Sequence, residues 1–126
     1  MGEDTNFLAL FDHAAETRKL GPGEILFRTG DAADTAFIVK DGQLHIFDGV
    51  VVFETVTPGD IIGEMALVDH APRSASVKAV TYAEVIPIDQ KRFLSMVAQT
   101  PFFAIRVMKV LTARLRATDA KLKAAV

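Results

Sequence analysis

Regularly spaced turn signals in the middle of the chain constrain the fold more than any other feature. Within residues 22–89, short runs rich in Ile, Val and Phe are separated by dipeptides that favour tight turns: Gly30-Asp31, Asp41-Gly42, Asp48-Gly49 and Pro58-Gly59. Short strands joined in this way favour an antiparallel sandwich or jelly roll over alternating β/α units. The clearest predicted hairpin joins Leu44–Phe47 to Val50–Phe53 through Asp48-Gly49, which suits a two-residue type I′ turn.

Helical patterns flank this β unit on both sides. Apolar residues at helical spacing predict a helix over 6–19, which Pro22-Gly23 ends. After the last strand, Asp89 is expected to cap a short helix over 90–98, and Thr100-Pro101 to begin a longer helix. The predicted fold class is α+β: an antiparallel β-roll with one N-terminal and two C-terminal helices.

The long terminal helix has a heptad pattern. Residues spaced alternately four and three apart along it are nearly all apolar: Ala104, Met108, Leu111, Leu115, Thr118, Leu122 and Ala125. Such a seam is typical of a helix that packs along a parallel partner helix, although a helix buried on its own β-roll shows it too. Because the helix is long for so small a roll, we expect a homodimer formed through residues 104–125.

The composition argues against catalysis. The chain has no cysteine, which excludes disulfides, iron–sulfur clusters and thiol nucleophiles. The spacing of His13, His45 and His70 matches no metal-ligand pattern, and the chain has no catalytic triad or phosphate-loop signature. A non-enzymatic protein with no metal or cofactor is therefore expected. At 126 residues the chain is expected to form one domain, 1–126.

Charge and hydropathy suggest where the protein acts. No apolar run approaches a membrane span and the N-terminus is acidic, so we expect a cytoplasmic protein without membrane contact. Residues 100–126 hold six basic side chains and one acidic side chain. A basic helix can touch nucleic acid, but cations are also favoured toward a helix C-terminus. Because no DNA-reading motif follows, direct DNA binding is not expected.

One segment, residues 62–77, has the chemistry of a binding site. Gly63 precedes Glu64 in an apolar run, and Arg73 follows nine residues after that Glu. The amides from Gly63 to Ala66 can open a short helix against an anion. Arg73 offers a planar fork of donors for phosphate oxygens, and Glu64 an acceptor for a sugar hydroxyl. A site with one anion-binding half and one hydroxyl-binding half describes a ribose phosphate site. The alternative is a structural Glu–Arg salt bridge.

This segment resembles the phosphate-binding cassette of cyclic-nucleotide-binding domains, whose pattern is G-E-(apolar)-A-L…R-(S/T/A)-A, with every signature position filled. Residues 22–31 and Asp41-Gly42 resemble further turns of that family, so the resemblance covers nearly the whole chain. It implies a β-roll that senses a cyclic nucleotide and signals through its last helix, which acts as a lid and dimer helix.

The resemblance also implies roles for particular residues. Arg73 and Ser74 would hold the cyclic phosphate, and Glu64 the ribose 2′-hydroxyl, with backbone amides of the cassette as further donors. Ile62 and Val77 would wall the base. The full expected ligand-binding set is Ile62, Gly63, Glu64, Met65, Ala66, Arg73, Ser74, Val77, Thr118 and Asp119.

The resemblance also implies polar contacts to the base from the terminal helix. Residues 113–121 are similar to the dimer helix of the catabolite-activator type of this family, which places Thr118 at an adenine-contacting Thr. Asp119 stands where those proteins have a Ser that reaches the opposing subunit, and Asp can accept a hydrogen bond but not donate one. In the family, Thr after the cassette Arg accompanies cGMP. Since this chain has Ser74 there, cAMP is expected over cGMP.

The sequence also allows two alternatives. One is a degenerate β-roll that serves dimerisation or partner docking without a nucleotide. The other is a transcription regulator that lacks its helix-turn-helix domain. The expected partners are a cyclic nucleotide, a second copy of the chain and a downstream protein that the sequence does not identify.

Overall fold

Two antiparallel sheets and two C-terminal helices make up the part of the chain that the computed structural model describes, residues 16–125. The elements follow the chain in this order: β1 (Arg18–Leu20), β2 (Ile25–Phe27), β3 (Thr35–Asp41), β4 (Leu44–Asp48), β5 (Val51–Val56), β6 (Ile61–Ile62), a short 3-10 helix η2 (Glu64–Leu67), β7 (Ser76–Ala79), β8 (Ala83–Asp89), α1 (Gln90–Gln99) and α2 (Phe102–Ala125).

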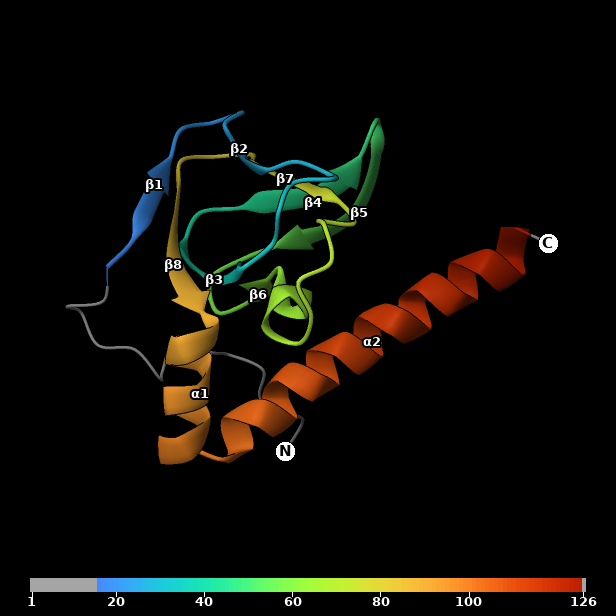
Figure 1. Cartoon of the computed structure of the whole chain (residues 1–126). Coiled ribbons are helices and arrows are strands. Elements are labelled where there is room, and N and C mark those ends of the chain that lie inside the picture. The colour runs from blue at the N-terminus through green and yellow to red at the C-terminus, as the bar shows by residue number, and fades with distance from the viewer. Residues whose placement is uncertain (1–15, 126) are drawn as a thin grey trace.

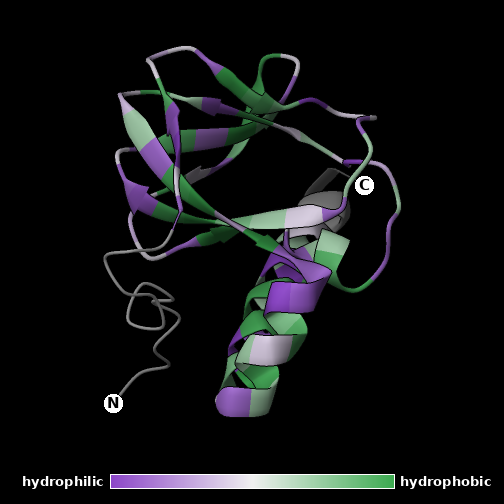
Figure 2. Ribbon diagram, turned by 60° about the vertical axis from the view of Figure 1, so that its left-hand side comes forward, coloured by the Kyte–Doolittle hydropathy of each residue, from purple (hydrophilic) through white to green (hydrophobic). Residues whose placement is uncertain are grey.

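The strands form the predicted antiparallel β-roll. One sheet has the order β1-β8-β3-β6 and the other β2-β7-β4-β5, with every pairing antiparallel. Hydrophobic residues alternate with hydrophilic ones along several strands (Figure 2), as expected where one face of a sheet is buried. The inward residues form a core that includes Leu20, Val39, Leu44, Val56, Val77 and Val85.

The two helices lie at one end of the roll, where a second apolar cluster fixes them. Asp89 caps α1 as predicted, because its side chain accepts from the Arg92 backbone amide at 2.8 Å. The fully buried Phe103 anchors α2 on residues of β3, β6 and β8. Figure 1 shows α1 continuing directly from β8, and α2 crossing beside η2 with its C-terminal end beyond the strands. None of the described helices is long and apolar enough to span a membrane.

The structure changes two local predictions. Arg18 and Lys19 belong to strand β1 and not to the helix predicted over 6–19, because they pair with Val85 and Glu84 of β8. This sheet pairing outweighs the local helical spacing. Residues 1–15, which hold the rest of that predicted helix, lie outside the described part of the chain.

The β4–β5 hairpin forms as predicted, but with a different turn. Asp48 pairs with Val51, so the turn consists of Gly49 and Val50 instead of Asp48-Gly49. Gly49 has a φ of 58°, whereas no described non-glycine residue has a positive φ. This fits a type II′ turn, since a type I′ turn would force the β-branched Val50 into the left-handed region.

Candidate functional site

A cavity of about 820 Å³ lies between the cassette segment, the β4–β5 hairpin and α2. Its volume is within the usual range for small-molecule sites. All the predicted ligand-binding residues except Asp119 line it: Ile62, Gly63, Glu64, Met65, Ala66, Arg73, Ser74, Val77 and Thr118. Asp119 belongs to α2, but its side chain lies outside the described part of the structure.

Gly63 shapes the start of the cassette. Its φ of 70° and ψ of 26° place it in the left-handed region, directly before η2. A Cβ atom on this residue would lie only 2.6 Å from Nη1 of Arg73. Glycine is therefore required twice here, once for the backbone conformation and once for the space that the guanidinium occupies.

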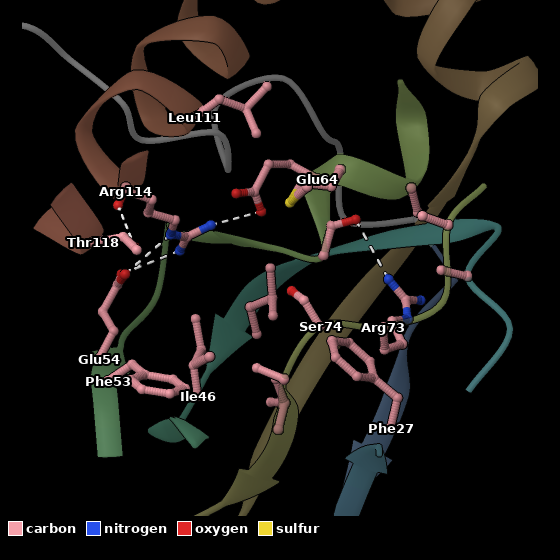
Figure 3. Close-up of a pocket in the computed structure, with 18 of the residues that line it drawn as sticks. Phe27, Ile46, Phe53, Glu54, Glu64, Arg73, Ser74, Leu111, Arg114 and Thr118 are labelled. Atoms are coloured by element: carbon pink, nitrogen blue, oxygen red, sulfur yellow. Dashed lines mark hydrogen bonds and ion pairs between the residues drawn. The ribbon is translucent and has the colours of Figure 1, made fainter. Parts of the chain in front are cut away.

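Arg73 is held at the cavity by backbone and aromatic contacts. The side chain is buried, with the residue 8% exposed. Its Nη2 donates to the Thr35 carbonyl at 2.6 Å, and its Nη1 lies 3.5 Å from the Gly63 carbonyl. The guanidinium carbon lies 4.0 Å from the centre of the Phe27 ring (Figure 3). Its Nε is buried and has no hydrogen-bond partner among the described residues.

The carboxylates that partly balance the charge of Arg73 lie beyond ion-pair distance. Burial lowers the pKa of its guanidinium, while the charges of Asp34, Asp31 and Glu64 act in the opposite direction. Within the described chain, no carboxylate lies within ion-pair distance of Arg73. A buried cation with an unused donor has the properties of an anion-binding group.

Glu64 makes its ion pair with a residue that sequence reasoning missed. It is 4% exposed, and its Oε2 accepts from Nη1 of Arg114 in α2 at 2.6 Å. The structural Glu64–Arg73 salt bridge that the sequence left open is therefore not formed. The described residues supply no donor to the second oxygen of Glu64, Oε1.

Arg114 links three parts of the fold. Its Nε and Nη2 donate to the two oxygens of Glu54 on β5 at 3.0 and 3.1 Å, and Nη2 also donates to the Ile61 carbonyl at 2.8 Å. Burial by itself lowers the pKa of Arg114, but its hydrogen bonds and charge interactions with Glu54 and Glu64 outweigh burial and raise this pKa.

One signal in the sequence places Arg114 near the cavity. It lies three residues after Leu111 and four before Thr118, so it shares their face of the helix. The Thr118 hydroxyl donates to the Arg114 carbonyl at 3.1 Å, which leaves its lone pairs for an incoming donor. The remaining cavity wall is largely apolar and includes Phe27, Ile46, Phe53, Ile62, Val77, Leu111 and Leu115.

Metal binding has no support in the described residues, since no three His, Asp or Glu side chains come together in a group that could hold an ion. The ring nitrogen Nδ1 of His70 lies 3.4 Å from the carbonyl oxygen of Ala33.

Comparison with known proteins agrees with this geometry. The cyclic nucleotide-binding domain family matches residues 17–100. The cyclic AMP receptor protein of Thermus thermophilus is 31% identical over 111 residues, which cover 83% of this chain and 51% of that protein. The lysophospholipase nte1 of Neurospora crassa is 27% identical over 84% of this chain but only 7% of its own length.

The chain thus spans about half of the first relative and a small part of the second. Among solved structures, the Thermus thermophilus catabolite activator protein superposes with a TM-score of 0.80 at 25% identity, covering 99% of this chain and 60% of that one. The chain belongs to the family of cyclic nucleotide-binding domains.

Proposed function

We propose that the chain is a non-catalytic sensor that binds a cyclic nucleotide in this cavity and prefers cAMP to cGMP. One observation carries the proposal: a buried cation with an unused donor and a buried carboxylate with an unused oxygen line the same cavity. The first suits a phosphate and the second a sugar hydroxyl, and the wall between them is largely apolar.

The phosphate half of the site centres on Arg73. A cyclic phosphate in the cavity would accept from the guanidinium, whose Nε is unpaired, and would supply the counter-charge that this buried group lacks within the fold. Ser74 follows Arg73 directly, is exposed and lines the cavity, so its hydroxyl can donate to a second phosphate oxygen. The Phe27 ring restricts how far the guanidinium can turn.

The sugar half centres on Glu64. Its Oε2 is committed to Arg114, and its Oε1 can accept from the ribose 2′-hydroxyl. Because the carboxylate is charged and buried, this bond would be stronger than one between neutral groups.

The preference for cAMP rests on Thr118. Its hydroxyl proton is directed to the Arg114 carbonyl, so toward the cavity it can act as an acceptor. The exocyclic amine of adenine is a donor, whereas guanine has a carbonyl oxygen at the same position.

We further propose that α2 transmits occupancy through a homodimer. Thr118 and Arg114 line the cavity from α2, and along the same helix Leu115 is 69% exposed and Met108 51% exposed. A parallel α2 from a second copy, packed along residues 104–125, would bury them. A ligand that favours one position of α2 then shifts the dimer between two arrangements.

Titration calorimetry with cAMP and cGMP tests the proposal. We expect saturable one-site binding with cAMP tighter than cGMP. Absence of binding to either nucleotide would favour the other reading of this fold, a dimerisation or docking module, and cGMP binding tighter than cAMP would contradict the role given to Thr118.

A further inference from the structure

The structure points to a role for Glu54, a residue that no sequence motif singled out. Resting on the proposed nucleotide site, we propose that Glu54 is a positioning residue for the hydroxyl-binding carboxylate of Glu64. Glu54 holds the guanidinium of Arg114 in a fixed orientation, so that Arg114 gives Glu64 one hydrogen bond and leaves Oε1 available to the ribose.

The hydrogen bonds of Arg114 carry this inference. A guanidinium has five N–H donors in a rigid fork. Glu54 takes the Nε edge of this fork through both of its oxygens, at 3.0 and 3.1 Å. The Ile61 carbonyl takes a further Nη2 donor at 2.8 Å, so only Nη1 is directed to Glu64. Figure 3 shows Arg114 between the two carboxylates, with Glu54 and Glu64 on different sides of its guanidinium.

The three charges also differ in their contact with solvent. The Glu64 side chain is 6% exposed, whereas those of Arg114 and Glu54 are 23% and 38% exposed. Glu54 lies on β5 and Arg114 on α2, so the pair ties the lid helix to the hairpin at the edge of the cavity. The buried carboxylate lies on the inner side of that connection, where a hydroxyl group would contact it.

Loss of the Glu54 charge would change which carboxylate oxygens of Glu64 are available to a ligand. An arginine without a fixed partner pairs with a carboxylate through two parallel hydrogen bonds when it can. Arg114 would then turn its freed donors toward Glu64 and occupy both carboxylate oxygens. A ribose hydroxyl would have to compete with Arg114 for Oε1, while a nucleotide without that hydroxyl would lose nothing.

Whether nucleotide binding becomes weaker or tighter distinguishes this positioning role from a simple charge effect. Glu54 is a negative charge beside a cavity proposed to bind an anion. If only charge mattered, its neutralisation would remove a Coulomb repulsion and tighten binding of any cyclic phosphate. The positioning role predicts weaker binding instead, and only for a ligand with a 2′-hydroxyl.

The experiment is titration calorimetry of cAMP and of its 2′-deoxy analogue with four proteins: wild type, Glu54→Gln, Arg114→Lys and the Glu54→Gln/Arg114→Lys double variant. Asp48→Asn is the matched control, because it removes the same charge from the same hairpin at an exposed position away from the cavity.

We expect Glu54→Gln to weaken cAMP binding about two- to tenfold, the range of one net hydrogen bond. Binding of the 2′-deoxy analogue should stay unchanged or become tighter, because only the charge effect acts on it. Asp48→Asn should change neither. In the Arg114→Lys background, which keeps the charge but lacks the fork, Glu54→Gln should have little further effect.

Tighter binding of both nucleotides, equal weakening of both, or no change would overturn the role of Glu54 and leave the nucleotide site intact. The full effect persisting in the Arg114→Lys background would do the same. If the wild type binds neither nucleotide, the proposed function fails and this inference fails with it.

Discussion

Replacement of Arg73 by lysine gives the sharpest test of the phosphate site. Arg73→Lys keeps a positive charge at a buried position but removes the planar fork. The structure shows what the fork does: Nη2 donates to the Thr35 carbonyl at 2.6 Å, the guanidinium carbon lies 4.0 Å from the centre of the Phe27 ring, and the buried Nε has no partner among the described residues. An ammonium at the end of a flexible stem cannot satisfy these directions together.

The expected magnitude follows from these contacts. A phosphate bound by the fork receives two charge-assisted hydrogen bonds, of which lysine can retain one. Each contributes about 1.5–3 kcal/mol, so cAMP affinity should fall about ten- to hundredfold. The fold should lose a comparable amount, about 1 kcal/mol for the hydrogen bond to Thr35 and about as much for the Phe27 contact.

Calorimetric titration with cAMP measures the first effect, and thermal unfolding without ligand measures the second. Arg28→Lys is the control, since it makes the same change at an exposed position outside the cavity and should alter neither. Unchanged cAMP affinity in a folded Arg73→Lys protein would refute the reasoning, because the phosphate would then have to bind elsewhere.

Three further predictions concern the cassette glycine and α2. Gly63→Ala should destabilise the fold by at least about 1 kcal/mol, because Ala is strained at φ 70° and its Cβ would contact the Arg73 guanidinium. It should also weaken cAMP binding, whereas Gly49→Ala, at a positive φ with nothing within 4 Å, should destabilise the fold without changing affinity; equal affinities in the two variants would contradict this. Leu115→Glu should convert the proposed dimer to a monomer, because it places like charges at the centre of the seam. Sedimentation that shows a monomeric wild type, with and without cAMP, would exclude the dimer. Thr118→Leu should weaken cAMP binding by about 1 kcal/mol for one net hydrogen bond and leave cGMP binding unaffected. An unchanged ratio of the two affinities would remove Thr118 from the site.

Local patterns in the sequence were sufficient for much of the fold. The Asp89 cap, the hairpin of β4 and β5 and the short helix after Gly63 each depend on residues a few positions apart. Interactions of this range, such as a side chain that accepts from an amide three residues on, are set by the neighbouring sequence. The cassette was predicted for the same reason, since Gly63, Glu64 and Arg73 lie within one short segment.

Long-range packing decided what the local sequence did not indicate. Phe102 and Phe103 are adjacent and equally apolar, yet Phe102 is 74% exposed and Phe103 fully buried, because only Phe103 faces the second core cluster. In the same way, the sheet pairing with β8 makes Arg18 and Lys19 a strand in spite of their helical spacing.

The candidate site shows the same division between local sequence and long-range packing. Its chemistry, an arginine and a glutamate at cassette spacing, was evident in the sequence, but their partners were not. Arg114 lies 50 residues from Glu64 and 60 from Glu54, and Phe27 contacts Arg73 from strand β2. These residues meet only because the roll closes and Phe103 docks α2 beside the cassette. The sequence alone determined which groups are proposed to bind a ribose phosphate, because they lie in one short segment, and the tertiary structure decided which neighbours orient them.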